Sequence, residues 1–508
     1  MSKAIYEAIQ NEALKLVRRH QKYAFSLQEN INRIARRTGI IQAKDIKLPP
    51  YWACDDGFNP YHVRSHAKSV SHAVSRAIRE KYYIPRPAAI YTLPKPDGGE
   101  RRVSVFQVAD NAVSRLVFKS LLHKNSNRMS PRCYSYRTDI TLHDAVLHIS
   151  SEFGLSNRLF VAEFDFSKYF DNVSHDHIER MLKDYRFYVT EREMHVVRGF
   201  LRAPRLDIDE YDVASTAFES RGIPQGTSIS LFLANIAAFP LDRKLEQMGV
   251  GFVRYADDTL IWSPSYSAIC EAVNALEEAA TEMGVAINLR KSDGISILTE
   301  SNSASEFKNK SSVSFIGYSI NGNRISISDR SIAKAKKHIS YLVYSNLIQP
   351  LKQGSFVASR ISPGVDRDYV VAIFQIRRYL YGDLSETQLR KHIAGIVPKI
   401  HYRGLMSFYP IVDDDDLLRE LDGWLLGTLA RALRLREKLL RRRGVGSLPK
   451  PHGLTRYQLI YFTTNSSKGD FIDLRVPSFF RMASLLRKAT RMYGPNAIAH
   501  PESGEYYF

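Results

Sequence analysis

The feature that most constrains this chain is a pair of adjacent acidic residues inside an apolar stretch. Residues 251–263 read GFVRYADDTLIWS, which predicts two short strands joined at Asp257 and Asp258. A second apolar run, LFVAEFDF at residues 159–166, predicts a buried strand that ends in acid at Asp165. Carboxylates beside buried strands cost free energy unless a positive charge neutralises them, so we expect a cation at these residues.

The expected ligands of this cation are oxygen atoms, which favour magnesium, or manganese as the alternative, over zinc. Three carboxylates from two strands can hold two ions about 3.5–4 Å apart, an arrangement used for in-line phosphoryl transfer. Taken alone, however, an Asp-Asp pair is more often a polar turn, because aspartate is a common turn former.

The predicted elements around these acids favour an α+β domain with helices on one face of a sheet. The segments AAIYTL and VSVF, within residues 88–106, flank a cluster of turn formers and predict a hairpin. Residues 228–245 predict a buried helix that Pro240 kinks or ends. A further helix is predicted over residues 269–283, followed by a half-buried strand over 285–289.

The rest of the chain predicts mainly basic helices, over residues 1–45, 63–82, 330–345, 368–381 and 417–443. The chain has 72 lysines and arginines against 53 acids, a net charge of +19, which favours a polyanionic partner such as nucleic acid. Its three scattered cysteines exclude a disulfide framework and fit a reducing cytoplasm. No apolar run reaches about 18 residues, so no membrane span is expected.

The acidic pair also stands in a recognisable motif. Tyr255-Ala256-Asp257-Asp258, framed by apolar strands, resembles the YxDD motif of reverse transcriptases. Other segments resemble motifs A, B and D and the primer grip of that family, and these are FDFSKYFDNVSHD (164–176), RGIPQGTSISLFLANI (221–236), INLRKSD (287–293) and FIGY (315–318). PKPDGGERR (94–102) and YSYRTDITLHDAV (134–146) resemble the fingers motifs of bacterial group II intron and retron enzymes. The motifs keep the family's order over about residues 80–320, which makes a joint chance match improbable.

The resemblance implies roles for single residues. Asp165, Asp257 and Asp258 would hold two Mg²⁺ ions, with the Phe166 carbonyl as a further ligand. One ion would activate a primer 3′-hydroxyl, and the other would hold the triphosphate and stabilise the leaving pyrophosphate. Lys291 resembles the motif D lysine, a candidate general acid for pyrophosphate, although a surface lysine explains it equally well.

The same resemblance implies a nucleotide site. Lys95 and Arg101 resemble the fingers residues that grip the triphosphate. Gln225 and Gly226 resemble the motif B turn beside the incoming nucleotide. Phe170 resembles the bulky residue that excludes a 2′-hydroxyl and so selects dNTPs, although a core phenylalanine is the alternative.

Two further groups would contact nucleic acid. Phe315, Gly317 and Tyr318 resemble the grip that positions the primer end. The basic run Arg441, Arg442 and Arg443 predicts RNA binding, with a solvated helix face as the alternative interpretation.

The implied architecture is a right-hand α+β polymerase with a helical N-terminal extension and a mainly helical, basic C-terminal region. Its expected parts are the extension (1–80), fingers (81–158), palm (159–325, with a fingers-type insertion at about 177–222), helical thumb (326–400) and basic C-terminal region (401–508).

The implied activity is RNA-directed DNA synthesis by a nucleotidyltransferase that uses dNTPs and an RNA template and yields DNA. The overall pattern most resembles bacterial phage-defence reverse transcriptases of the abortive-infection and unknown-group type, which suggests a dedicated non-coding RNA as template. The alternatives are a retron or group II intron-type enzyme or maturase, and a template-independent or protein-primed DNA polymerase that would use the terminal Tyr506 or Tyr507. An RNA polymerase and a non-enzymatic RNA-binding scaffold with a decayed polymerase fold are also open, as is a homo-oligomer.

Overall fold

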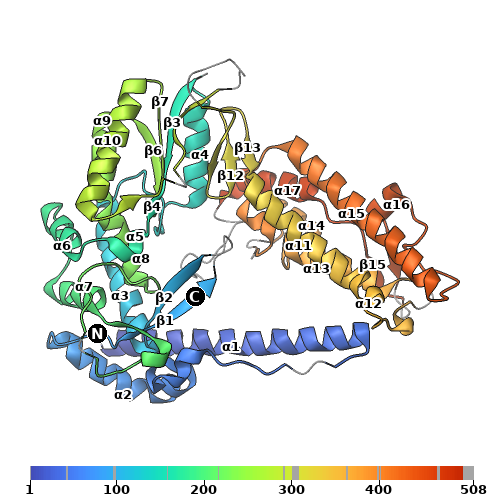
Figure 1. Ribbon diagram of the computed structural model, residues 1–508, viewed down its shortest axis with the longest axis horizontal. Helices are drawn as coiled ribbons and strands as arrows, with labels where there is room; N and C mark the ends of the chain where they lie inside the picture. Colours follow the sequence, from blue (N-terminus) through green and yellow to red (C-terminus); the bar gives the residue numbers. More distant parts are fainter. Residues whose placement is uncertain are drawn as a thin grey trace. The chain divides into compact units, whose positions relative to one another are not determined.

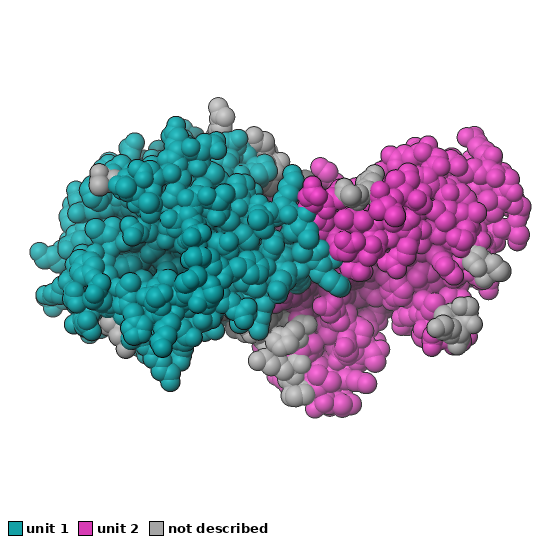
Figure 2. Space-filling model, turned by 90° about the horizontal axis from the view of Figure 1, so that it is seen from below, with its two compact units in different colours: residues 1–25, 46–311, 503–508 teal, residues 26–45, 312–502 magenta. Residues whose placement is uncertain are grey.

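The structure is a computed structural model, and it describes residues 2–41, 44–94, 99–156, 158–215, 217–289, 292–299, 308–361, 364–397, 400, 402–465 and 469–495. The chain forms two compact units (Figure 2). The first comprises residues 1–25 and 46–311, and the second comprises residues 26–45 and 312–502.

The largest described sheet of the first unit has five strands. Its strands, in order across the sheet, are β10 (Asn309–Lys310), β9 (Gly294–Leu298), β3 (Leu159–Phe164), β7 (Asp258–Ser263) and β6 (Gly251–Tyr255). Of these, β3, β6 and β7 are labelled in Figure 1. Strand β3 pairs antiparallel with both β9 and β7, and β7 pairs antiparallel with β6. The two strands predicted on either side of the acidic pair are therefore β6 and β7, and they are hydrogen-bonded to each other.

Helices cover both faces of this sheet, which differs from the predicted one-sided arrangement. On one face, Phe160 of β3 packs against Tyr266, the first residue of α10 (Tyr266–Met283), with ring centroids 5.3 Å apart. On the other face, Trp262 of β7 packs against Phe153 of α4 (Leu142–Phe153), with ring centroids 5.5 Å apart. The physical reason lies in β7 itself, where the residues after Asp258 are all buried and both faces therefore need a cover.

The helix predicted over residues 228–245 is two helices, α8 (Ser228–Ala237) and α9 (Phe239–Met248). Pro240 stands in the first turn of α9, where its missing N–H costs nothing and its fixed φ suits a helix start. The predicted break at this proline is confirmed. Most of α8 is buried, and its apolar residues belong to the main core of the unit.

The predicted hairpin is also confirmed, as β1 (Ala88–Pro94) and β2 (Glu100–Val105), which pair antiparallel. Strand β5 (Arg205–Asp207) adds parallel to β1. The strand predicted over 285–289 is much shorter, since only β8 (Ala286–Ile287) forms and pairs with β4 (Phe166–Ser167).

The remaining helices of the first unit surround these strands. They are the N-terminal part of α1 (Ser2–Thr38), α2 (Pro60–Arg79), α3 (Val108–Asn125), α5 (Tyr169–Asn172), α6 (His175–Asp184) and α7 (Glu191–Arg202). Helix α1 buries Ile5, Ile9, Ala13 and Val17, which recur every four residues and therefore share one face. The mixture of packed helices and a mainly antiparallel sheet confirms the α+β fold class predicted from the sequence.

The second unit combines a three-stranded sheet and a two-stranded sheet with a helical part. The strands of the first sheet are β11 (Val313–Phe315), β12 (Tyr318–Ile320) and β13 (Ile325–Ile327), and those of the second are β14 (Thr463–Asn465) and β15 (Phe471–Asp473). Its helices are α11 (Asp329–Leu347), α12 (Gln349–Lys352), α13 (Arg367–Tyr381), α14 (Glu386–Ile393), α15 (Asp415–Arg442), α16 (Arg456–Ile460) and α17 (Phe479–Tyr493).

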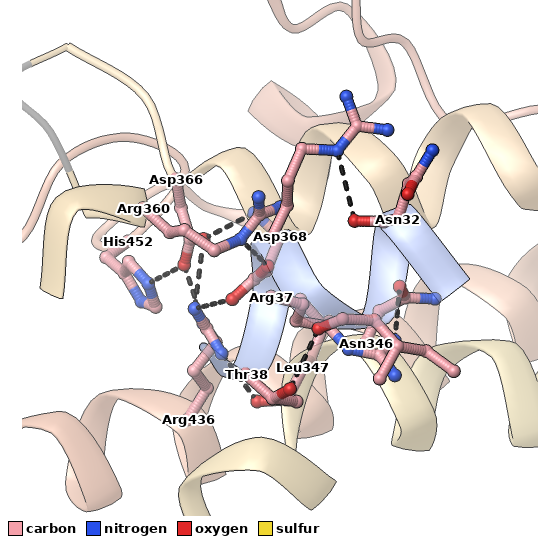
Figure 3. A network of polar contacts seen from close by, with 12 residues as sticks. Asn32, Arg37, Thr38, Asn346, Leu347, Arg360, Asp366, Asp368, Arg436 and His452 are labelled. Atoms are coloured by element: carbon pink, nitrogen blue, oxygen red, sulfur yellow. Dashed lines mark hydrogen bonds and ion pairs between the residues drawn. The ribbon is translucent and has the colours of Figure 1, made fainter. Parts of the chain in front are cut away.

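A buried charge network crosses this second unit (Figure 3). Arg436 of α15 is fully buried and donates to Asp366 at 2.6 Å, to Asp368 at 2.8 Å and to the Leu347 carbonyl at 2.8 Å. Burial opposes the charge of Asp366, but His452 and Arg436 outweigh it and lower the pKa of this carboxyl to about 2. The network links the α11 and α13 segments to α15 through charges that are all compensated.

Candidate active site

The register of two neighbouring strands brings the predicted acids together. Phe164 of β3 lies opposite Thr259 of β7. The next residue outward is Asp165 on one strand and Asp258 on the other, so both acids leave the same end of the sheet. Asp257 lies in the tight turn between β6 and β7, directly before Asp258. Three carboxylates from distant parts of the sequence thus lie at the same end of the sheet.

The acids differ in exposure. The Asp165 side chain is 8% exposed, whereas Asp257 is half-buried and Asp258 is exposed. Because Asp165 is the most desolvated of the three, it gains most from a neutralising partner.

Asn288 supplies polar contacts to Asp165. Its side-chain Nδ2 donates to the Asp165 carboxylate at 3.0 Å, and its backbone N–H donates to the Asp165 carbonyl at 2.8 Å. The Asp165 N–H donates in turn to the Ser292 hydroxyl at 3.3 Å. These two residues come from the segment that resembles motif D, but sequence reasoning gave them no role. The sequence signal for Asn288 is its position as a polar amide between the apolar residues Ile287 and Leu289.

The donor set suits a hard divalent cation, because it offers carboxylate oxygens and the carbonyl of the buried Phe166. In the described part of the chain, no three His, Cys, Asp or Glu side chains are gathered tightly enough to hold a metal ion as they stand. Like-charged carboxylates repel one another when nothing compensates them. The chemistry of these donors therefore suits a cation, while the described side chains do not form a ready-made site.

Phe170 lies next to the segment that resembles motif B. Its carbonyl accepts a hydrogen bond from Ile223 at 2.6 Å, and its half-buried ring meets Tyr169 edge-on at 5.8 Å. The Tyr169 hydroxyl donates to the Ala234 carbonyl of α8 at 2.7 Å, which fixes this segment to the core.

The turn at Gln225 and Gly226 packs directly against the hairpin. The Ser104 N–H of β2 donates to the Gln225 carbonyl at 2.6 Å. Gly226 has a φ of +133°, and a Cβ there would overlap the Ser104 carbonyl oxygen. Glycine is required by both the backbone conformation and the close approach.

The hairpin carries the predicted triphosphate-binding residues. Arg101 is exposed, and Arg102 donates to Asp207 of β5 at 3.1 Å. Lys95, like Lys291 of motif D and the terminal Tyr506 and Tyr507, lies outside the described residues.

The predicted primer grip belongs to the second unit. Phe315 and Tyr318 face each other across the β11–β12 turn, and Gly317 adopts a φ of +84° within it. Tyr318 is fully buried, and the Gly317 carbonyl accepts from Ser328 at 3.0 Å. The turn is tightly anchored, and its role toward a primer stays a prediction.

The basic run at the end of α15 makes local contacts. Arg441 pairs with Glu437 at 2.9 Å, and Arg443 donates to the Leu351 carbonyl at 2.6 Å. All three arginines are exposed, and RNA binding by them stays a prediction. None of the described helices is long and apolar enough to cross a membrane.

Comparison with known proteins identifies the domain that carries the site. Residues 93–320 match the family described as Reverse transcriptase (RNA-dependent DNA polymerase). Over 227 residues the chain is 30% identical to the COX1/OXI3 intron 1 protein of Saccharomyces cerevisiae, covering 44% of this chain and 25% of that protein. Over 173 residues it is 26% identical to the protein YkfC of Escherichia coli, covering 33% of this chain and 42% of that protein. The chain therefore spans less than half the length of either relative.

Structural comparison aligns the chain with telomerases from two Candida species at low TM-scores. Telomerase from Candida albicans, in complex with a fragment of telomeric RNA, has a TM-score of 0.40 at 13% identity and covers 76% of this chain and 67% of its own. Apo telomerase from Candida tropicalis has a TM-score of 0.40 at 12% identity and covers 84% of this chain and 68% of its own.

The family match and the site coincide. Asp165, Asp257 and Asp258 all fall inside the matched segment, as do strand β2 and the Gly226 turn. The segment that carries the predicted site is therefore similar to the reverse transcriptase family.

The close approach at Gly226 gives a test of the site's packing. Gly226→Ala adds a methyl group that overlaps the Ser104 carbonyl, so we expect it to lower the free energy of unfolding by about 2 kcal/mol more than a Gly→Ala change in open space. Gly249→Ala is the matched control, because Gly249 also has a positive φ, of +69°, but no atom near its Cβ position. Urea denaturation of both variants measures the difference, and equal destabilisation would show that the packing is looser than described.

Proposed function

We propose that this protein is an RNA-directed DNA polymerase that copies an RNA template into DNA from dNTPs. The observation that carries the proposal is the β3–β7 register, which attaches Asp165 beside Asp258 inside a segment that matches the reverse transcriptase family. The surplus of basic residues over the whole chain suits a nucleic-acid template and product.

The site residues then have defined tasks. Asp165, Asp257, Asp258 and the Phe166 carbonyl would hold divalent ions, with Mg²⁺ the proposed metal. Such ions lower the pKa of a primer hydroxyl and stabilise charge on the triphosphate. Asn288 holds the Asp165 carboxylate in place through its 3.0 Å hydrogen bond.

The remaining residues bind and select the nucleotide. Arg101, which is exposed on the hairpin, would grip phosphate oxygens through its planar fork. Lys95 is proposed to act with it and Lys291 to protonate the leaving pyrophosphate, both on the strength of their motifs. Gln225 and Gly226, whose turn is hydrogen-bonded to β2, would lie beside the incoming nucleotide.

The acidic pair offers the direct test of the activity. Asp257→Asn with Asp258→Asn keeps the shape of both side chains but removes two negative charges that would hold the metal. We expect incorporation of labelled dNTP on an RNA template with an annealed primer to fall at least about 10³-fold. Asp184→Asn, an exposed acid at the end of α6, is the control and should incorporate like the unmodified protein. Activity that survives the double substitution would contradict the assigned site.

Phe170 offers a test of sugar selection. A ring beside the nucleotide would clash with a 2′-hydroxyl, so Phe170→Ala should reduce the preference for dNTPs over NTPs by about 10- to 100-fold. The ratio of kcat/KM for the two nucleotides measures this preference. If the protein were instead an RNA polymerase, NTP use would be unchanged by the substitution, and a core role for the ring would also leave the ratio unaltered.

For the biological role we propose antiviral defence in a bacterial cytoplasm, with a dedicated non-coding RNA as template. The proposal rests on the resemblance of the motifs to bacterial phage-defence enzymes. A second candidate, an intron-type reverse transcriptase, is favoured by the 30% identity to the COX1/OXI3 intron 1 protein.

Sequencing the RNA and DNA that co-purify with the protein separates these roles. A single abundant non-coding RNA with complementary DNA supports defence, and spliced or intron RNA supports the second candidate. Phage plaque counts on cells that carry the unmodified protein or the Asp257→Asn, Asp258→Asn variant then test defence directly. Equal counts with both would rule out a defence role that depends on DNA synthesis.

A further inference from the structure

Arg254 is a fully buried arginine in β6, three residues before Asp257. No other arginine in the described part of the first unit is fully buried. Its backbone is already secured, because its N–H donates to the Arg132 carbonyl at 3.0 Å and its carbonyl accepts from Tyr134 at 2.9 Å. The side chain is therefore not needed to hold the strand edge.

The guanidinium is fixed from one side by a bidentate ion pair. Nε and Nη2 of Arg254 each lie 2.6 Å from a carboxylate oxygen of Asp242, which is itself buried in the first turn of α9. Burial opposes the charge of Arg254, but the attraction of Asp242 outweighs it and raises the pKa of the guanidinium. A buried ion pair is weak evidence for added stability, because desolvation offsets much of the Coulomb attraction.

The remaining guanidinium nitrogen of Arg254, Nη1, points toward the turn that carries Asp257. Nη1 donates to the Ala256 carbonyl at 3.1 Å, and Nη2 also reaches the Asn235 carbonyl at 3.4 Å. The Ala256 carbonyl belongs to the peptide bond that joins Ala256 to Asp257. A hydrogen bond to this oxygen therefore restrains the orientation of the Ala256–Asp257 peptide plane. That orientation in turn sets the direction of the Asp257 side chain.

The turn needs such a restraint. Ala256 has a φ of +59°, a left-handed conformation that is uncommon for residues with a Cβ. Two adjacent aspartates follow it, and their mutual repulsion favours moving apart. A charged donor fixed by α9 holds the peptide before them in place.

We propose that Arg254, clamped by Asp242, is a positioning residue that sets the Ala256–Asp257 peptide so that the Asp257 carboxylate can ligate a divalent cation. This inference rests on the proposed function, since it deepens the role of the same site. It assigns to Asp242 of α9 the task of aiming the arginine.

Lysine at position 254 separates positioning from charge. A lysine keeps one positive charge beside Asp242, but its single ammonium lacks the planar fork that bonds Asp242 and Ala256 together. The matched control is Arg436→Lys in the second unit. Arg436 is also fully buried and bound to two aspartates, but its remaining contact is to the Leu347 carbonyl.

The experiment measures Mn²⁺ binding to the full chain by electron paramagnetic resonance, with no nucleotide or template present. Asp257→Asn marks which bound Mn²⁺ belongs to the site. We expect Arg254→Lys to weaken this binding about 10-fold, the order seen when a residue that orients a metal ligand is changed. Arg436→Lys should bind Mn²⁺ like the unmodified protein, even if its melting temperature falls as much as that of Arg254→Lys.

Primer extension on the same proteins gives the second measurement. Arg254→Lys should lower kcat and raise the Mn²⁺ concentration needed for half-maximal rate, with little change in template–primer affinity. Rescue of kcat at high Mn²⁺ would support positioning, because a merely structural defect does not depend on the metal.

The outcomes separate this inference from the proposed function. If the unmodified protein binds Mn²⁺ through Asp257 but extends no primer, the polymerase proposal fails, and Arg254→Lys still tests positioning through binding. If the protein extends primers and Arg254→Lys binds Mn²⁺ normally, the positioning role is wrong. Equal loss of Mn²⁺ binding in Arg436→Lys, or no Asp257-dependent Mn²⁺ in the unmodified protein, also overturns it.

Discussion

The antiparallel pairing of β3 with β7 is the constraint on which the site depends. Side chains at the end of an antiparallel pair are placed by register, and a shift of one residue would send each to the opposite face of the sheet. With Phe164 opposite Thr259, the acids that follow and precede these residues emerge together. The burial of β7 on both faces locks that register, because a slip would move its apolar residues out of contact with α4 and α10.

Two polar side chains near the acids, Asn288 and Arg254, make hydrogen bonds that do not neutralise the negative charge of the acids. Asn288 donates to Asp165 as a neutral amide, so it orients the carboxylate without neutralising its charge. Arg254 acts through the Ala256 backbone carbonyl, and its own charge is balanced by Asp242.

The second unit is organised by different means. Its charge network is fully enclosed, with Arg436 compensated by two aspartates and His452 adjoining one of them at 3.1 Å (Figure 3). Arg37 of α1 belongs to the same unit and donates to Asn346 of α11 at 3.0 Å. Hydrogen bonds and ion pairs therefore join residues from the start, middle and later part of the chain in one unit. No local sequence pattern predicts these contacts.

Local patterns in the sequence by themselves determined the hairpin of β1 and β2, the break at Pro240, the strands around the acidic pair and the long helix α15. Each of these depends on residues within one turn or one strand, namely turn formers, a proline and apolar periodicity. The motifs also indicated which acids to examine and in which family to place them.

Only the tertiary structure decided that helices cover both faces of the sheet, that β8 is just two residues long, that Asn288 binds Asp165 and that Asp242 binds Arg254. These contacts join residues from separate elements, so no periodicity or local propensity encodes them. The hydrogen-bond partner of a buried polar side chain is set by packing, which removes water and leaves a particular group within hydrogen-bonding distance.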